Sequence, residues 1–323
     1  MNLVLVIFSL LAAMVPMVSY MVVIWHLDKY DREPIWLVSL NFAWGAFGAI
    51  IIGLVVSEFF EKSLSGVIFV EKNQNALSSI LTAPLVEELA KAIFLIFITA
   101  PQKDFDNITD GIVYGTAIGL GFGMTENFLY FLKVETPQEW LTLVPLRSVL
   151  SAVMHACSTS VVGIFVGYSK FQAAKNEKWL ISLGLFIAMI IHFIWNFSVT
   201  IGSGNFMFIG IAFIFVSVVV MVIFFQSSLL VESKVIKKEL TEEAELGLIP
   251  AEHINYLPYT HLRNRSGWLK ENVDLPRYIR TATLLAFRKQ QYKTCFEPQK
   301  VFYEKDIEDA REEISHMLNG TPI

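Results

Sequence analysis

The hydrophobic positions of the chain fall into seven long stretches that are separated by short polar segments. Each stretch is long enough for a helix that crosses about 30 Å of hydrocarbon, which takes about 20 residues. The pattern predicts an all-α fold, a polytopic membrane bundle of about seven transmembrane helices. The predicted spans are Leu3–Trp25, Ile35–Ser57, Leu77–Thr99, Gly111–Leu132, Val144–Tyr168, Trp179–Thr200 and Phe206–Leu230.

The composition supports this interpretation. Of the 323 residues, 54% are hydrophobic and only 17% are charged, which places the chain among membrane proteins. The first stretch differs from a secretory signal peptide, because no Lys or Arg precedes Lys29 and because the stretch is too long. We therefore expect it to be a transmembrane helix.

The end of the chain has a different composition. Residues 232–323 hold 14 Lys/Arg and 15 Asp/Glu, whereas residues 1–231 hold 11 and 15. This balance is typical of a soluble, mostly helical appendage, not of a nucleic-acid-binding arm. The sequence predicts a transmembrane domain over residues 1–231 and a cytoplasmic tail over residues 232–323. The tail segment LPRYIRTATLLAFRKQQ is amphipathic and basic, so it either lies on a membrane surface or packs on neighbouring helices.

The distribution of basic residues between the loops predicts the orientation in the membrane. The loops after the first, third and fifth spans carry six Lys/Arg, and the alternate loops carry four. Because basic loops stay on the cytoplasmic side, we expect the N-terminus outside and the C-terminus in the cytoplasm.

The third span, within PLVEELAKAIFLIFITAP, carries Glu87, Glu88 and Lys91 near its middle. One charged side chain at the centre of a membrane helix costs roughly 2.5–3.5 kcal/mol. Other spans carry further groups that lipid would reject, namely Glu126, Asn127, His155, His192 and Asn196. At 1.5 Å of rise per residue, these groups fall within about 8 Å of one another in depth, in the outer half of the bilayer. The sequence predicts that they form one site.

Helix periodicity supports this prediction. Glu87 and Lys91 are four residues apart, so they share a face and can pair. The fifth span has one polar stripe formed by Ser148, Ser151, His155, Ser158 and Thr159. Glycines recur every fourth residue in the fourth span, at Gly111, Gly115, Gly119 and Gly123, which predicts close contact with another helix. Cys157 is two residues from His155 and points to another side, so we interpret it as a buried, inert thiol.

Two chemistries would use such a set of groups. In the first, one of two neighbouring carboxylates acts as general base for water, and imidazole or amide groups stabilise an oxyanion, as in a peptide hydrolase. In the second, His155, His192 and one glutamate such as Glu126 bind a catalytic zinc ion. The chain has no HExxH motif, so the residues alone do not choose between the two.

Other interpretations remain open from the residues alone. Glu87, Glu88 and Lys91 could form an ion pair that only locks helices together, and membrane carboxylates also serve as proton relays in transporters. The chain lacks two halves with matching interrupted helices, which are typical of transporters. A third alternative is a non-catalytic membrane scaffold whose tail recruits a partner.

Several segments together resemble the PrsW family of bacterial intramembrane proteases, which is related to the CAAX prenyl proteases. They are DKYDREP, EELAK, DGIVYGTAIGLGFGMTENFLYF, MHACSTS and HFIWN, and the resemblance as a whole covers most of residues 1–200. By this resemblance Glu87 and Glu88 are the family's glutamate pair, and Glu126 belongs to its second acidic motif. His155 and His192 are then the family's two histidines.

The resemblance implies an intramembrane protease in the bacterial inner membrane, with an anti-sigma factor as a substrate class. The family has been described both as metal-dependent and as glutamate-type, so zinc stays open as a cofactor. Asn196 departs from the family pattern, since relatives can carry Asp at this position. The residues from Glu232 on lie outside the resemblance.

We combine these inferences into one set of roles. Glu87 is expected to be the base for the attacking water, and Glu126 is expected to orient that water. Glu88 and Lys91 form a supporting pair, and Asn127 is a further supporting residue. His192 and Asn196 are expected to stabilise the oxyanion, while His155 is a supporting group or a metal ligand.

Overall fold

The computed structural model describes residues 3–64, 74–105, 107–170, 177–295 and 297–319. These residues are helical or irregular, and no strand occurs among them, so the predicted all-α class is confirmed. They form two compact units. We call the first the membrane unit; it holds the described residues up to Phe225 except Asp28–Arg32. We call the second the tail unit; it holds Asp28–Arg32 and the described residues from Gln226 on.

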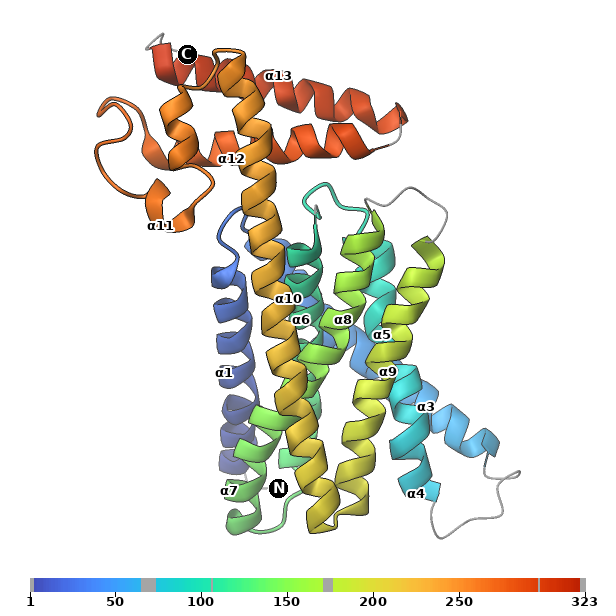
Figure 1. Ribbon diagram of the computed structural model, residues 1–323. Helices are drawn as coiled ribbons and strands as arrows, with labels where there is room; N and C mark the ends of the chain where they lie inside the picture. Colours follow the sequence, from blue (N-terminus) through green and yellow to red (C-terminus); the bar gives the residue numbers. More distant parts are fainter. Residues whose placement is uncertain (1–2, 65–73, 106, 171–176, 296, 320–323) are drawn as a thin grey trace. The chain divides into compact units, whose positions relative to one another are not determined.

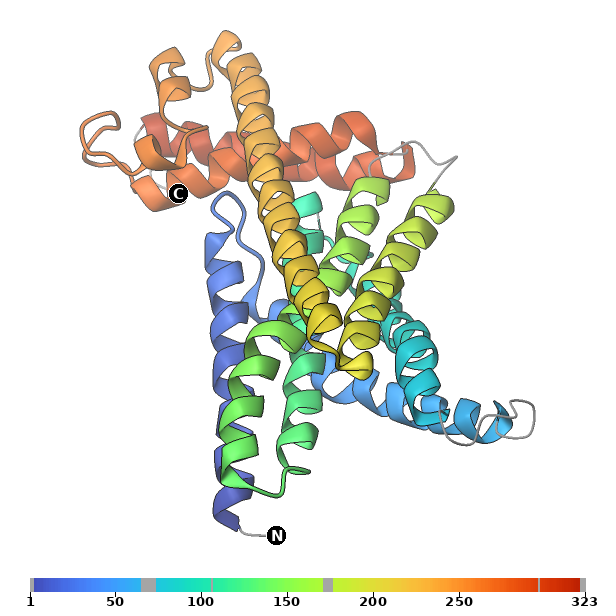
Figure 2. The same ribbon diagram turned by 60° about the horizontal axis from the view of Figure 1, so that its bottom comes forward.

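The membrane unit is a bundle of long helices (Figure 1). Both views show α3 leaning away from the common direction of the other long helices (Figures 1 and 2). The helices of this unit are α1 (Leu3–Leu27), α2 (Ile35–Ala43), α3 (Ile50–Leu64), α4 (Gln74–Leu77), α5 (Ala83–Phe94), α6 (Ile108–Phe131), α7 (Pro137–Leu146), α8 (Ala152–Lys170), α9 (Glu177–Ile201) and the first part of α10 (Gly204–Glu245).

Short π-helical segments join several of these helices end to end. They are η1 (Trp44–Ala49), η2 (Ser78–Thr82), η3 (Leu95–Thr99) and η4 (Arg147–Ser151). A π turn holds one more residue than an α turn and so rotates the side chains that follow it, and such turns often lie at functional sites. Here η2 directly precedes the helix with the glutamate pair, and η4 directly precedes the helix with His155.

Helix α6 is the central element of the membrane unit. Its residues from Thr109 to Gly123 are all buried, and it packs against α8, α1, α2 and η1. The asparagine at its start, Asn107, accepts a hydrogen bond from the backbone of Asp110, whose side chain accepts one from Asn107 in return. This reciprocal cap satisfies two backbone N–H groups that would otherwise lack partners.

The glycine stripe of α6 faces α8, so the predicted close helix contact is confirmed. A Cβ atom added to Gly119 would lie 2.2 Å from the backbone oxygen of His155, and one on Gly111 would lie 2.1 Å from that of Gly163. Only glycine permits this approach of the two backbones. The stripe therefore fixes the backbone of α8 at His155 directly against α6.

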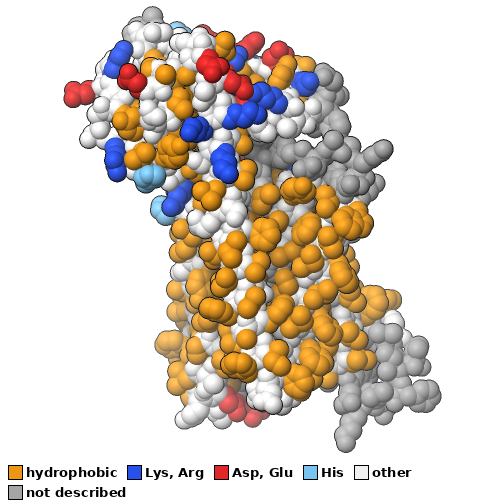
Figure 3. Space-filling model, viewed as in Figure 1, with side chains coloured by type: hydrophobic (Ala, Val, Ile, Leu, Met, Phe, Trp, Pro, Cys, Tyr) orange, Lys and Arg blue, Asp and Glu red, His pale blue; other side chains and the backbone are white. Residues whose placement is uncertain are grey.

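Among the described residues, five helices are long and apolar enough to cross a membrane. In the most apolar windows of α1 and α10 only 17% of the residues are buried, so these two helices present mostly apolar surface to their surroundings. The face of the membrane unit seen in Figure 3 is correspondingly covered by hydrophobic side chains. The five are α1, Ile35–Phe60, Pro137–Lys170, Trp179–Ile201 and α10.

The two other predicted spans, Leu77–Thr99 and Gly111–Leu132, are also helical, yet their composition is more polar. The first carries three charged residues in its middle, and the second is rich in glycine and ends in polar groups. Because helices in the interior of a bundle do not have to face lipid, they can be less apolar than the outer ones. The exact number of seven spans is thus not confirmed by composition.

The tail unit has a hydrophobic core of its own. It consists of the remainder of α10, the 3₁₀ segment η5 (Ala251–Asn255), α11 (Thr260–Arg263), α12 (Leu275–Thr294) and α13 (Glu297–Asn319). The core residues come from all the long helices, and Tyr278, Ala282 and Leu285 of α12 are fully buried. The amphipathic segment considered above as a membrane-surface helix is α12, and its apolar face packs on α10 and α13.

Part of the loop that follows α1 belongs to the tail unit. Tyr30 donates a hydrogen bond to the backbone oxygen of Pro258 (2.8 Å) and packs against the tail core. Arg263 lies over the Tyr30 ring at 5.2 Å and donates to the backbone oxygen of Lys29. These contacts give a structural role to the DKYDR sequence.

Candidate active site

The glutamate pair lies on α5, directly after the π-helical segment η2. Consecutive residues of a helix point about 100° apart, so the two carboxylates face different surroundings. Glu88 is completely buried, whereas the Glu87 side chain is 16% exposed. Lys91 is one turn further along and fully buried, which places its ammonium group between the two carboxylates.

The carboxylate of Glu88 accepts three hydrogen bonds in the interior of the bundle. Its Oε1 atom accepts hydrogen bonds from Lys91 Nζ (2.8 Å) and from Ser158 Oγ (3.1 Å). It also accepts one from His192 Nδ1 (2.9 Å), because an ionised carboxylate can only accept. Glu88 thus links α5 to both α8 and α9 and fixes the orientation of the His192 ring.

Lys91 makes further contacts that hold its charge in the interior. Its Nζ atom lies 3.0 Å from His155 Nδ1 and 4.0 Å from the centre of the Phe122 ring. An ammonium group has only donors, so Nδ1 of His155 accepts this hydrogen bond. The negative face of the phenyl ring adds a cation–π contact. A buried lysine with a carboxylate, an imidazole and an aromatic face around it is well compensated for the loss of water.

A second ionic group lies around Glu126 on α6. Its Oε2 atom lies 2.5 Å from an Arg147 amino group and 3.0 Å from His155 Nε2. Arg147 also donates from Nε to Asn127 Oδ1 (3.0 Å). His155 bridges the two ionic groups, since one ring nitrogen contacts Lys91 and the other contacts Glu126.

Glu87 differs from Glu88 and Glu126 in that its carboxylate makes no hydrogen bond to the described residues, whereas Glu88 has a bonded Oε1 beside an unbonded Oε2. The Oε2 atom of Glu87 is buried and has no hydrogen-bond partner among the described residues. The nearest cationic groups are Lys91 Nζ at 3.9 Å and His192 Nε2 at 3.8 Å. These distances are too long for hydrogen bonds, so the oxygen keeps its lone pairs available.

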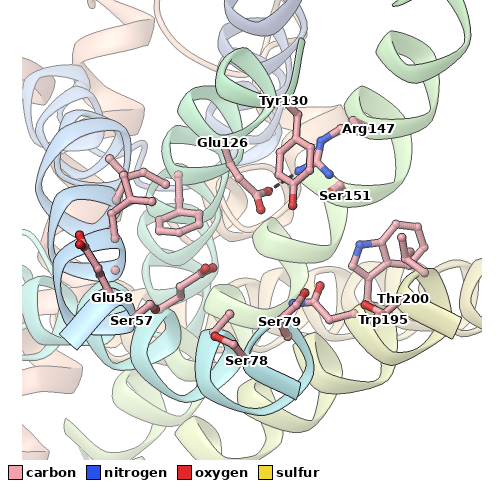
Figure 4. Close-up of a pocket in the computed structure, with 18 residues that line it drawn as sticks. Ser57, Glu58, Ser78, Ser79, Glu126, Tyr130, Arg147, Ser151, Trp195 and Thr200 are labelled. Carbon is pink, nitrogen blue, oxygen red and sulfur yellow. Dashed lines mark hydrogen bonds and ion pairs between the residues drawn. The ribbon is translucent and has the colours of Figure 1, made fainter. Parts of the chain in front are cut away.

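Glu87 lies on the wall of a cavity of about 760 Å³ in the membrane unit. Four serines, Asn196 and Thr200 line it together with apolar residues such as Leu54 and Trp195. Figure 4 shows Glu126 and Arg147 pointing toward one another on its wall, with Tyr130 beside them. The serines are Ser57, Ser78, Ser79 and Ser151. A cavity of this size with polar groups in its lining can hold water next to the Glu87 side chain, which is 16% exposed.

The structure brings most of the predicted site residues into one connected group. Hydrogen bonds and ion pairs join Glu88, Lys91, His155, Glu126 and Asn127, and His192 enters through Glu88. These predicted site residues therefore lie together in the structure.

Asn196 lies apart from this group. It lines the same cavity, and its side chain donates to the backbone oxygen of Ser79 (2.9 Å) instead of contacting the ionic groups. In the predicted polar stripe of the fifth span, Ser158 on α8 contacts Glu88, and Ser151 at the end of η4 lines the cavity. Cys157 is buried and unpaired, as expected for an inert thiol.

Arg147 was not singled out from the sequence. It stands at the edge of a predicted span, where a basic residue is usually a loop charge that marks the membrane boundary. Its distance of 20 residues from Asn127 gave no periodic signal that the two would meet. The contact arises from tertiary structure, because α7 and α8 return alongside α6.

The comparisons with known proteins point to one family. Residues 33–226 match the family model described as "PrsW family intramembrane metalloprotease". Three curated proteins, each named "Protease PrsW", are similar over more than half of the chain. The chain is 29% identical to the protein of Bacillus subtilis over 174 residues. This aligned region covers 54% of this chain and 74% of the relative.

The two other relatives give similar values. Identity is 29% over 188 residues with the protein of Clostridioides difficile (58% of this chain, 77% of the relative) and 30% over 176 residues with that of Geobacillus kaustophilus (54% and 72%). No solved structure matches the chain. The chain belongs to the PrsW family of intramembrane proteases. The predicted family and the predicted protease activity are thereby confirmed, and the protein is a multi-pass membrane protein.

The description of the PrsW family as metalloproteases raises the question of whether this chain can bind a metal ion. One carboxylate oxygen of Glu87 and one ring nitrogen each of His155 and His192 lie within 4.8 Å of one another. Two histidines and one glutamate are a frequent ligand set of catalytic zinc. The predicted set had Glu126 as its carboxylate, whereas the group of three that the described residues form contains Glu87.

The surroundings of the three residues fit a metal ion in most respects. The free oxygen of Glu87 needs a partner, and the hydrogen bond from His192 Nδ1 to Glu88 leaves Nε2 as an acceptor. Ligating histidines usually donate their other nitrogen to a carboxylate in this way. His155 fits less directly, because both of its ring nitrogens have contacts, one with Lys91 and one with Glu126. It would give up one of them on binding a metal ion.

Proposed function

We propose that the chain is an endopeptidase that hydrolyses a peptide bond of a membrane-protein substrate with Glu87 as the group that activates water. The observation that carries this proposal is the Glu87 carboxylate, which lines the polar cavity, is partly exposed and makes no hydrogen bond to the described residues. A carboxylate oxygen without a hydrogen-bond partner can take a proton from a water molecule in that cavity. The oxygens of Glu88 and Glu126 that are bound by cations are poorer bases.

The other site residues would support this reaction. Glu88 and Lys91 hold each other and the His192 ring in place, while His155 connects them to Glu126. Glu126 lines the cavity and is held by Arg147, so it can orient the water. Asn196 keeps a second amide hydrogen after donating to Ser79, and that hydrogen can stabilise an oxyanion. His192 would join it as a donor in its protonated form.

A metal ion would be held by Glu87, His155 and His192. Bound there, it would acidify water and polarise the scissile carbonyl. Metal content of the purified protein, measured for the parent and for His192→Ala, tests this assignment. Loss of a stoichiometric metal in the variant would support it, and equal, substoichiometric metal in both would leave Glu87 to act as a base alone.

We further propose that all seven predicted spans cross the membrane and that cleavage occurs in its outer half. The apolar exterior of the membrane unit and the interior position of α6 support the first point. The excess of basic residues in the loops after the first, third and fifth spans supports the second. A site in the outer half suits a substrate cut close to the outer membrane surface, as in the processing of an anti-sigma factor.

The orientation can be tested with reporter fusions. A reporter after Leu230 should be cytoplasmic, and one within the Lys133–Trp140 loop should lie outside. The reverse result would move the site to the cytoplasmic half of the bilayer and contradict an anti-sigma-like substrate.

Reconstitution tests the proposed function directly. The purified protein, placed in liposomes with single-span substrates, should release fragments whose ends lie in the outer half of the substrate's span. Mass spectrometry of the fragments locates the cut. A cut in the inner half, or in a soluble loop only, would contradict the proposed position of the active site.

A further inference from the structure

The structure assigns Arg147 a positioning role in the proteolytic reaction: it holds Glu126 in the orientation that the active site uses. Arg147 contacts Glu126 through one terminal amino group (2.5 Å) and Asn127 through Nε (3.0 Å). These two acceptors are consecutive residues on α6, so the planar guanidinium donates hydrogen bonds to two neighbouring side chains of the helix. The inference rests on the proposed role of Glu126 at the active site.

The fold prepares Arg147 for this contact. It is the first residue of η4, the π-helical segment between α7 and α8, and its side chain is only 13% exposed. The Tyr130 ring packs against the guanidinium at 3.6 Å. Because Tyr130 is one helical turn after Glu126, α6 provides both the acceptors and the aromatic face. Arginine is suited to this arrangement, since its flat fork can stack and donate at the same time.

The contact with Arg147 also influences His155. Glu126 Oε2 is shared between Arg147 and His155 Nε2, and Lys91 occupies the other ring nitrogen of His155. If Glu126 moved, His155 would lose the partner that fixes one edge of its ring. Arg147 therefore acts through Glu126 on the histidine that faces His192, whose ring centre is 4.9 Å away.

The test compares five variants in the full-length protein reconstituted in liposomes. Arg147→Met removes the fork, and Arg147→Lys keeps the charge with a single donor group. Lys133→Met is the matched control, because Lys133 lies over the same Tyr130 ring at 5.3 Å and is exposed. Glu126→Gln and its combination with Arg147→Met complete a double-mutant cycle.

We expect Arg147→Met to lower kcat roughly 10- to 100-fold with little change of KM, since a displaced catalytic group costs about this much. Arg147→Lys should recover at least a third of the lost activity on a logarithmic scale, and Lys133→Met should match the parent. The double variant should be no slower than Glu126→Gln alone within about twofold, because groups that act as one unit are not additive.

Other outcomes overturn the inference. If the effects of Arg147→Met and Glu126→Gln multiply in the double variant, Arg147 acts independently of Glu126. If Arg147→Met is as active as the parent, it has no positioning role. If Arg147→Met does not assemble, as judged by its thermal stability in detergent, Arg147→Lys becomes the deciding variant. A parental kcat of Arg147→Lys would show that the two hydrogen bonds from the guanidinium are dispensable. Parental activity of Glu126→Gln would instead contradict the proposed role of Glu126.

Discussion

The membrane unit and the tail unit each contain a cluster of three glutamates, and the two clusters are paired with cations differently. In the tail, Glu239 and Glu242 on α10 have Lys293 at 2.6 and 2.8 Å, and Glu243 has Arg311 at 2.6 Å. Lys289 of α12 adds a further cation close to all three. Each glutamate of this cluster thus has a cation within hydrogen-bond distance.

The three glutamates of the membrane unit share fewer cations. Lys91 contacts Glu88 and Arg147 contacts Glu126, while Glu87 has its nearest ammonium group at 3.9 Å. This difference between the two clusters indicates which carboxylates are available for catalysis. A cluster in which every carboxylate has a close cation stabilises helix packing. A mostly buried carboxylate without any hydrogen bond retains a free-energy cost of desolvation that a water, a proton or a metal ion can relieve.

The surfaces of the two units also differ, in the type of side chain that each exposes. The membrane unit exposes hydrophobic side chains, and the tail unit exposes charged ones, as each shows in Figure 3. The membrane unit therefore has its charges inside because the lipid excludes them, and their mutual contacts are obligatory. In the tail, water could solvate the same groups. Its ion cluster therefore forms because α10, α12 and α13 pack together, not because the surroundings exclude charge.

The largest expected effect comes from replacing the Glu87 carboxylate, which makes no hydrogen bond to the described residues. Glu87→Gln keeps the shape of the side chain but cannot take a proton from water, and loss of a general base lowers rates by about 10²–10⁴. Cleavage of a reconstituted substrate should fall near background while the protein still inserts. Glu58→Gln is the matched control, because Glu58 lines the same cavity but is exposed and paired with Lys62.

A parental rate for Glu87→Gln would show that the base is elsewhere. Glu88→Gln would then be the next variant. If both were fully active, neither glutamate of the pair would be catalytic, and the contrast between free and paired carboxylates would lose its functional meaning.

The next largest effect concerns the glycine stripe that holds α6 against α8. Gly119→Leu cannot be accommodated without separating the helices, because even its Cβ would lie 2.2 Å from a backbone oxygen. We expect a large loss of thermal stability in detergent and loss of cleavage. Gly204→Leu is the control, since no atom lies within 4 Å of a Cβ at that position. Equal melting of both variants would contradict the tight packing of α6 on α8.

The paired cluster of the tail gives a third effect. Lys289 is 7% exposed and contacts Glu243 at 2.7 Å, so Lys289→Met leaves buried carboxylates with fewer cations. Breaking a buried ion pair in this way costs about 3–5 kcal/mol. Amide hydrogen exchange of α12 should accelerate strongly, and that of α6 should stay slow. Arg277→Met removes an exposed ion pair with Glu313 and should cost at most about 1 kcal/mol. Similar exchange in both variants would mean that the cluster is not a stabilising one.

The sequence was sufficient to predict the convergence of the membrane site but not the cluster of the tail. A polar residue that faces lipid in a membrane span costs free energy. Contact between Glu88, His155 and His192 is therefore expected from the sequence. Charges on a soluble helix are ordinary, and nothing in the sequence marks Glu239 or Lys289 as buried. The same reason hides Arg147, which stands where a boundary charge is expected.

Element boundaries also show what polarity can predict. The seventh apolar stretch was placed at Phe206–Leu230, whereas α10 runs without a break from Gly204 to Glu245. Hydrophobicity marks the part of a helix that suits the bilayer, and the helix itself continues because its polar part packs in the tail core. The π-helical segments, which rotate Arg147 and the glutamate pair into place, have no recognisable sequence pattern here.

The smallest effect is a pH dependence that should appear in the tail unit alone. Burial lowers the pKa of His253 below its ordinary value of 6.5, with Glu252 opposing the shift and Lys270 adding to it. His253 is neutral in the folded tail, where Nδ1 lies 2.9 Å from the hydroxyl of Tyr278. Below pH 6.5 the unfolded chain takes up a proton that the folded chain resists, so stability falls as the pH falls.

This effect can be measured as faster amide exchange of α12 at pH 5.5 than at pH 7.5, after correction for the intrinsic exchange rates. His253→Asn keeps an acceptor near Tyr278 but does not titrate, so its exchange should depend less on pH. His261→Asn, which removes an exposed histidine of the same unit, should behave as the parent does. A parental pH dependence in His253→Asn would assign the effect to another group, and an equal response of α6 would mean that acid destabilises the whole chain and not the tail.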